Sequence, residues 1–168
     1  VEIPARFTVL ATGASAAALE AAGLCRRKAP SGMAVRTYYR HEALSGEIDY
    51  LSLSFDRRTL PGYGWVFPGP DATFNVGAGC FAGCGGEAVQ NVRRLFEAFT
   101  ESFPLARRLA AEGERVGELK GAPLRTALCG AEVSRPGLLV AGEAAGTTYS
   151  FSGEGIGSPA ASIIMWKS

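Results

Sequence analysis

The chain reads LLVAGEAAG at residues 138–146 and FSGEGI at residues 151–156. The apolar run 138–141 predicts a buried strand, and the acidic, glycine-rich residues after it predict a turn that leads into a helix. Glycines let a backbone approach a flat or phosphorylated ligand closely, and the first N–H groups of a helix are unpaired and favour negative charge. We therefore expect a ligand cradle here.

Composition limits the classes of protein to consider. The 168 residues are 47% hydrophobic, enough to bury a core in about one domain. The formal charge is +1, and Arg26-Arg27-Lys28 is the only short basic run, so we expect no nucleic-acid partner. No apolar stretch approaches the ~20 residues of a membrane span, and no signal-peptide pattern opens the chain. These features predict a soluble cytoplasmic protein.

Period-two patterns predict most of the structure before residue 80. Residues 7–11 form an apolar, β-branched run, followed by the turn Thr12-Gly13 and an alanine-rich helix at 14–22. Alternating apolar residues predict strands at 35–39 and 51–55, and two more are expected at 62–68 and 73–79. Together these strands predict an antiparallel sheet of about four strands.

A helical pattern follows the predicted sheet. Between residues 87 and 103 the apolar side chains recur at spacings of three and four, so one face of a helix is apolar and is expected to cover the sheet. Residues 105–111 predict a further short helix, and 113–124 a short strand that leads into a loop. The apolar positions of the longer helix are Val89, Val92, Leu95, Phe96, Phe99 and Phe103.

Several local matches to site motifs are weak. Gly77 to Ala82 has dinucleotide-fingerprint spacing but does not open into a helix, and residues 13–18 lack the second glycine. Cys80 and Cys84 lack a second ligand pair, so no metal site is expected. His41, the only histidine, is interpreted as a surface residue in preference to an acid–base catalyst.

An ordered set of motifs resembles one family. Residues 61–79 carry PGYGWVFP and then NVGAG, which resemble the Tyr-x-Trp-x-Phe-Pro and Gly-x-Gly signature of the geranylgeranyl reductase family of FAD-dependent oxidoreductases. LATGAS at 10–15, PGLLVAGEAAG at 136–146 and FSGEGI at 151–156 are similar to its flavin-contacting segments. The resemblance implies a para-hydroxybenzoate-hydroxylase-like fold, that is, an α+β chain that forms part of an FAD/NAD(P)-binding α/β fold.

The resemblance also implies ligands and sites. FAD is the implied cofactor, NADPH a candidate electron donor, and an isoprenoid or prenyl lipid the substrate, which would favour peripheral contact with a membrane. A helix start suits the negative charge of a reduced flavin, and a carboxylate suits ribityl or ribose hydroxyls. No catalytic residue is identified. The cofactor-binding residues implied are Thr12, Gly13, Gly142, Glu143, Ala144, Gly153, Glu154, Gly155 and Ile156, and the substrate-binding residues are Tyr63, Trp65, Phe67, Pro68, Gly77 and Gly79.

The resemblance divides the chain into three segments and exposes departures. Residues 1–30 and 125–168 would belong to the FAD-binding domain and flank a substrate domain at 31–124, whose antiparallel sheet is covered by a helix. The family's N-terminal Rossmann βαβ unit does not precede Val1, so we expect a fragment, or a partner chain that supplies this unit. Thr12 stands where the family usually has aspartate.

Three functional hypotheses remain at this stage. The first is a flavin-dependent reductase of isoprenoid double bonds. The second is a related flavin monooxygenase or halogenase, which the strand carrying Trp65 disfavours. The third is a non-catalytic piece that does not hold FAD alone. The aromatic stripe of Tyr63, Trp65 and Phe67 fits either a substrate slot or an ordinary core.

Overall fold

The computed structural model describes residues 3–24, 31–81, 91–125 and 132–149. Two compact units divide the chain. Unit 1 comprises Val1–Ser31, Gly83–Gly86 and Pro123–Ser168, and unit 2 comprises Gly32–Ala82 and Glu87–Ala122. The units contain separate sheets and separate hydrophobic cores. The predicted α+β class is confirmed.

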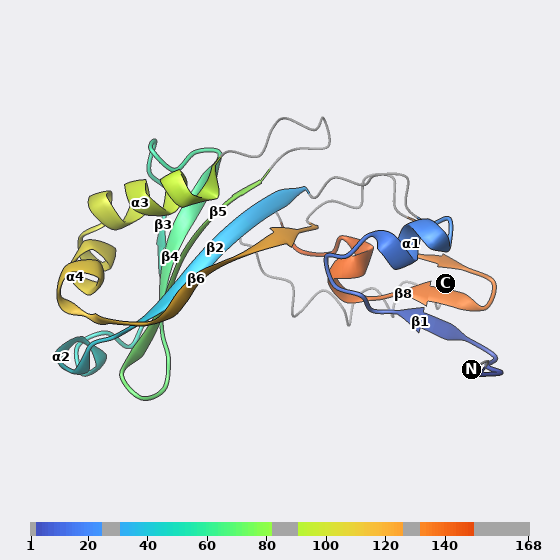
Figure 1. Ribbon diagram of the computed structural model, residues 1–168, viewed down its shortest axis with the longest axis horizontal. Coiled ribbons are helices and arrows are strands. Elements are labelled where there is room, and N and C mark those ends of the chain that lie inside the picture. The colour runs from blue at the N-terminus through green and yellow to red at the C-terminus, as the bar shows by residue number, and fades with distance from the viewer. Residues whose placement is uncertain (1–2, 25–30, 82–90, 126–131, 150–168) are drawn as a thin grey trace. The chain divides into compact units, whose positions relative to one another are not determined.

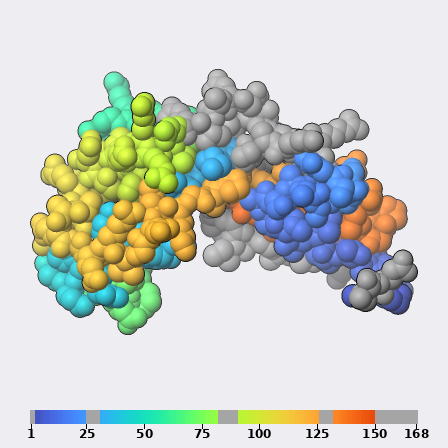
Figure 2. Space-filling view, viewed as in Figure 1, coloured from blue at the N-terminus to red at the C-terminus, as the bar shows by residue number. Residues whose placement is uncertain are grey.

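Unit 2 is built on an antiparallel sheet of five strands in the order β3-β4-β5-β2-β6 (Figure 1). The strands are β2 (Gly32–Arg40), β3 (Ser52–Ser54), β4 (Gly62–Pro68), β5 (Thr73–Phe81) and β6 (Glu114–Leu124). The sequence predicted a sheet of about four strands, and β6 is the additional strand. It is a mostly exposed edge strand, and its sequence, ERVGELKGAPL, lacks clear apolar alternation. Its atoms lie at the surface in Figure 2.

Two helices cover one face of this sheet (Figure 1). They are α3 (Val92–Ser102) and α4 (Pro104–Glu112). The side chain of Asn91 caps α3 by accepting hydrogen bonds from the N–H groups of Arg93 (3.0 Å) and Arg94 (3.4 Å), which fixes the helix start later than residue 87. The predicted apolar face is confirmed, because Leu95, Phe96 and Phe99 are buried.

The core of unit 2 lies between these helices and the sheet. The inward side chains come from alternate positions of β2, β4 and β5, as the period of a strand requires. The strands contribute Val35, Tyr39, Val66, Phe74, Val76, Ala78 and Cys80 to the core. Besides the three buried residues of α3, other helical residues in the core are Leu44, Ala106 and Leu109. Consequently the residues at the remaining positions of these strands point to the opposite face.

His41, which was expected to be a surface residue, is partly exposed and has a structural role. Its side chain is only 13% exposed, and its Nδ1 accepts a hydrogen bond from the N–H of Leu44 (3.3 Å), capping the short helix α2 (Glu42–Ser45). Its Nε2 lies 3.4 Å from Oε2 of Glu112. The pKa of Glu112 is lowered, first by the hydrogen bond from Arg108 and then by that from His41. These contacts join α2 to α4.

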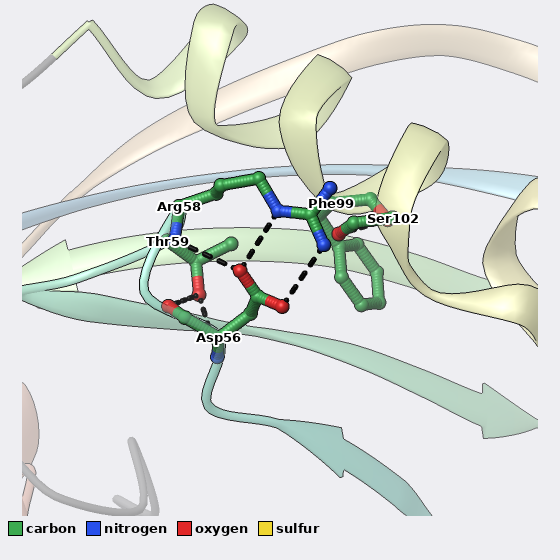
Figure 3. Close-up of polar contacts among 5 residues, drawn as sticks. All are labelled: Asp56, Arg58, Thr59, Phe99 and Ser102. Atoms are coloured by element: carbon green, nitrogen blue, oxygen red, sulfur yellow. Dashed lines mark hydrogen bonds and ion pairs between the residues drawn. The ribbon is translucent and has the colours of Figure 1, made fainter.

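The turn between β3 and β4 is held by its own side chains (Figure 3). The Nε–H and Nη2–H groups of Arg58 donate to the two carboxylate oxygens of Asp56, at 2.9 and 3.1 Å. The hydroxyl of Thr59, which is fully buried, donates to the carbonyl oxygen of Asp56 at 2.9 Å. The turn therefore enters β4 in a defined geometry.

Unit 1 contains a small sheet in the order β1-β8-β7. Strand β1 (Thr8–Leu10) runs parallel to β8 (Leu138–Val140), and β8 runs antiparallel to β7 (Ser134–Arg135). Helix α1 (Ala17–Ala21) and the 3-10 turn η1 (Gly142–Ala145) complete the described elements. The core comprises Leu19, Leu24, Val140, Ala144 and Ala145. Within the described residues of both units, no helix is long and apolar enough to cross a membrane.

Candidate functional site

Two sequence-predicted segments meet at one edge of the unit 1 sheet. Leu10 pairs with Val140 in parallel register, and the N–H of Ala141 donates to the carbonyl oxygen of Leu10 at 3.0 Å. Thr12-Gly13 and Gly142-Glu143 therefore leave the carboxyl ends of adjacent strands, although they are far apart in sequence. Ligands of open α/β sheets bind outside these strand ends. We call these two turns the strand-end site.

The backbone of the strand-end site requires glycine at two positions. Gly13 has φ +62° and Gly142 has φ +66°, both in the left-handed region that other residues rarely adopt. A Cβ added to either glycine would meet nothing within 4 Å among the described residues. These glycines are therefore needed for their conformation, and they leave open space beside the backbone. Such space suits the close approach of a ligand.

The carboxylate of Glu143 is oriented by the backbone of a buried residue. Its Oε1 accepts a hydrogen bond from the N–H of Arg125 at 3.1 Å, and Arg125 is 7% exposed. One carboxylate oxygen is thus used to fix the side chain, and a carboxylate has further lone pairs that accept from hydroxyl groups. Nothing in the sequence pointed to Arg125, because the contact is made by its backbone.

The other predicted residues of this site differ in their environments. The hydroxyl of Thr12 donates to the carbonyl oxygen of Ser15 at 3.2 Å, so this side chain stabilises its own turn. Ala144 is fully buried in the unit 1 core, so the structure does not expose it to a ligand. The predicted residues Gly153, Glu154, Gly155 and Ile156 lie outside the described residues.

A hollow of about 440 Å³ also occurs in unit 1, but at the other end of the strands. Phe7, Arg135 and Gly137 help to line it. Phe7 precedes β1 and Gly137 precedes β8, so the hollow lies at the amino ends of these parallel strands. It is therefore separate from the strand-end site.

Unit 2 presents an aromatic face on the side of the sheet opposite α3 and α4. Tyr63, Trp65 and Phe67 occupy alternate positions of β4 and lie side by side, with adjacent ring centroids 6.0 and 6.3 Å apart. The rings of Phe55 and Phe81 extend this row, at 5.1 and 5.8 Å from Tyr63. The aromatic face is defined by these five residues. Phe55 and Phe81 were not among the predicted substrate-binding residues, although each lies at a position of its own strand segment that the period of two places on this face.

The aromatic face is neither a sealed core nor a fully open surface. Tyr63 is buried, and this burial raises the pKa of its phenol, whereas Phe55 is 50% exposed and Trp65 and Phe67 are half-buried. Pro68 does not belong to this face, because it pairs with Phe74, whose side chain points into the helix-covered core. Of the predicted substrate residues, Pro68 is thus the one on the helix-covered side of the strand.

Gly77 and Gly79 lie opposite the aromatic side chains on the next strand. Tyr63 pairs with Gly79, and Trp65 pairs with Gly77. A Cβ at Gly77 would collide with the Trp65 ring, so the indole lies directly on the glycine backbone. The indole Nε1–H donates to Oδ1 of Asn75 at 3.1 Å. The sequence signature thus places a large flat ring against a strand that has no side chain beneath it.

No protein-family model and no curated protein matches the chain. Solved structures do resemble it. A geranylgeranyl bacteriochlorophyll reductase-like protein from Thermoplasma acidophilum has a TM-score of 0.68 at 20% identity, covering 95% of this chain and 38% of that one. A flavoprotein/dehydrogenase from Cytophaga hutchinsonii has a TM-score of 0.59 at 15% identity, covering 96% and 41%.

The myxobacterial chondrochloren halogenase, a variant of FAD-dependent halogenases, also resembles the chain, with a TM-score of 0.58 at 20% identity, covering 83% and 33%. The chain thus spans between a third and two-fifths of the length of these proteins. At such identities the likeness establishes the fold, and the predicted membership in the fold of FAD-dependent oxidoreductases is confirmed at that level.

Proposed function

We propose that this chain is part of an FAD-dependent oxidoreductase that reduces carbon–carbon double bonds of an isoprenoid. The observation that carries the proposal is the meeting of the Thr12-Gly13 and Gly142-Glu143 turns at one sheet edge. The fold shared with a geranylgeranyl reductase-like protein and other flavoproteins supports it. The aromatic face of unit 2 supports an apolar substrate.

The residues of unit 1 fit the chemistry of a flavin nucleotide. The open backbone at Gly13 and Gly142 would let its polar chain approach closely, and Glu143 would accept hydrogen bonds from its hydroxyl groups. FAD, when bound, supplies hydride transfer, and a proton must reach the second carbon of the double bond. We further propose NADPH as the electron donor.

The residues of unit 2 fit an isoprenoid. The half-buried rings of Trp65 and Phe67 and the exposed ring of Phe55 offer apolar area, and a branched hydrocarbon chain gains by leaving water for such a surface. Because a prenyl lipid resides in a membrane, we also propose that the protein meets its substrate by peripheral contact with a membrane surface.

The first test of this function is FAD binding by the purified full chain. We expect a saturable change in FAD fluorescence on titration with protein, and loss of affinity in Glu143→Ala. A protein that stays colourless and leaves FAD fluorescence unchanged would show that this chain does not bind FAD unaided. Adding a separately expressed Rossmann βαβ unit would then test whether FAD binding needs a contribution from another chain.

A flavin halogenase or monooxygenase is the second candidate, favoured by the similarity to the chondrochloren halogenase. The two functions differ in what reoxidises the flavin. We expect NADPH to bleach the flavin without oxygen, and geranylgeranyl substrate to restore its colour anaerobically with consumption of the double bond. Reoxidation that requires O₂ would identify the second candidate.

A further inference from the structure

Trp65 is held in place from two sides. Its Nε1–H donates to Asn75 at 3.1 Å, and its ring rests on Gly77, where a Cβ would collide with the indole. Both partners lie on β5, two positions apart and therefore on the same face. The hydrogen bond fixes the position of the indole Nε1–H group, and Gly77, which has no side chain, sets how close the ring lies to the sheet.

The neighbouring positions show that this arrangement is specific. Gly79 lies on the same face and the same strand, but the atoms nearest to an added Cβ there belong to Ala34 and Met33, beginning with the Cβ of Ala34 at 3.2 Å. Asn75 pairs with Phe67 across the strands, so its amide stands at the junction of two rings of the aromatic face. A polar side chain there is costly beside apolar rings unless it is hydrogen-bonded. The indole N–H provides that bond.

We propose that Asn75 is a positioning residue that locks the Trp65 indole flat on Gly77, and that this locked ring is the floor on which a prenyl chain lies. The inference rests on the proposed function for the identity of the ligand. It adds that residue 77 sets the depth of the binding surface, because any side chain there would lift the ring toward the ligand. Which ligands fit the aromatic face then depends on Gly77, a residue that does not touch the ligand.

The experiment uses Trp65 as its own reporter. The chain has only one other tryptophan, Trp166, so Trp166→Phe leaves Trp65 as the single emitter. In that background, Asn75→Leu removes the acceptor, whereas Asn75→Asp retains an acceptor oxygen of the same shape. We expect Asn75→Leu to lower the fluorescence anisotropy of Trp65 and to shift its emission, and we expect Asn75→Asp to restore both.

Titration with geranylgeraniol tests the binding half of the proposal. We expect a saturable change in Trp65 emission in the parent, with a midpoint roughly fivefold to tenfold weaker in Asn75→Leu, the effect of one lost hydrogen bond. Gly77→Ala should weaken the midpoint at least as much, whereas Gly46→Ala, a control away from the aromatic face whose added Cβ would meet only the carbonyl oxygen of Ala43 at 3.8 Å, should leave it nearly unchanged. Circular dichroism confirms that each variant is folded, and the two glycine variants carry the test if Asn75→Leu is unfolded.

Two results would overturn the inference. Equal anisotropy in the parent and Asn75→Leu would show that Asn75 does not hold the ring. Equal midpoints for Gly77→Ala and Gly46→Ala, or no response of Trp65 in the parent, would show that the ring is not a binding floor. The proposed function is tested separately by the FAD titration, because the residues proposed to bind FAD lie in unit 1 and Trp65 lies in unit 2.

Discussion

The N–H of Arg125 and the carboxylate of Glu143 are joined by a 3.1 Å hydrogen bond across 18 positions of sequence. This bond links the segment that follows β6 to the turn that follows β8. It gives Glu143 a structural role in addition to the ligand-binding role proposed for it, so the two roles must be separated by experiment.

Glu143→Ala and Glu143→Gln separate these roles. Alanine leaves the N–H of a buried residue without its acceptor and should destabilise unit 1 by about 1 kcal/mol or somewhat more. Glutamine retains a carbonyl oxygen and should preserve most of the stability while removing the charge. Urea unfolding measures the first effect and FAD titration the second. Equal stability of Glu143→Ala and the parent would argue that the Arg125 contact contributes nothing.

Gly13→Ala and Gly142→Ala test the conformational need for glycine. Both positions have positive φ, so alanine should cost roughly 1–2 kcal/mol even though no atom of the described residues lies within 4 Å of the added Cβ. Gly46→Ala is a matched control, because Gly46 has φ −84° and its Cβ would meet only the carbonyl oxygen of Ala43, at 3.8 Å. Urea unfolding of the three variants should rank Gly46→Ala as the most stable.

Gly64→Ala tests close packing between β4 and α3. An added Cβ would collide with the ring of Phe99, which is fully buried. Such overpacking should destabilise unit 2 by about 1–3 kcal/mol. Phe99→Leu in the same chain should recover part of that loss, which a double-mutant cycle measures. Strict additivity of the two substitutions would contradict the contact.

The ion pair in the β3–β4 turn predicts a pH dependence. Hydrogen bonds from the side chain and then the backbone of Arg58 lower the pKa of Asp56 from 3.8 to about 2. A lowered folded-state pKa contributes stability that is present above the unfolded value of 3.8 and is lost as the pH falls toward 2. Asp56→Asn should therefore be less stable than the parent at neutral pH, with the difference vanishing below about pH 2.

The control for this titration is Arg58→Gln. In that background the pKa of Asp56 returns toward its ordinary value, so Asp56→Asn should add little at any pH. Urea unfolding across the acidic range provides the measurement for all four chains. A stability difference between the parent and Asp56→Asn that stays constant with pH would refute the assignment, because an uncoupled carboxyl does not change stability as it titrates.

The fold was predictable where the sequence pattern is local. Period-two runs gave β2, β4 and β5 within a few residues, and the spacing of Leu95, Phe96 and Phe99 gave the covered face of α3. Strand β6 was underestimated, because an exposed edge strand is not required to alternate apolar and polar side chains. The start of α3 was placed too early, since Asn91 was not recognised as its cap.

The candidate site was predictable only in part, for a different reason. Tyr63, Trp65 and Phe67 could be placed on one face from their spacing, but Asn75 and Arg125 act through partners on other segments. The structural role of His41 was not predicted, because it depends on the N–H of Leu44 and on Glu112 of a distant helix. Contacts between elements that are remote in sequence leave no periodic signal in either one.

The parallel pairing of β1 with β8 also bears on how the chain folds. The two strands come from opposite ends of the sequence, and closing so long a loop in a disordered chain is entropically costly. The hairpins of unit 2 are far more local, and the N–H of Ser31 donates to the carbonyl oxygen of Leu124 at 3.0 Å, across 93 positions. We expect unit 2 to form first and to bring Ser31 and Leu124 together. Unit 2 would then act as an internal template, shortening the effective loop that β1 must close before the strand-end site can exist.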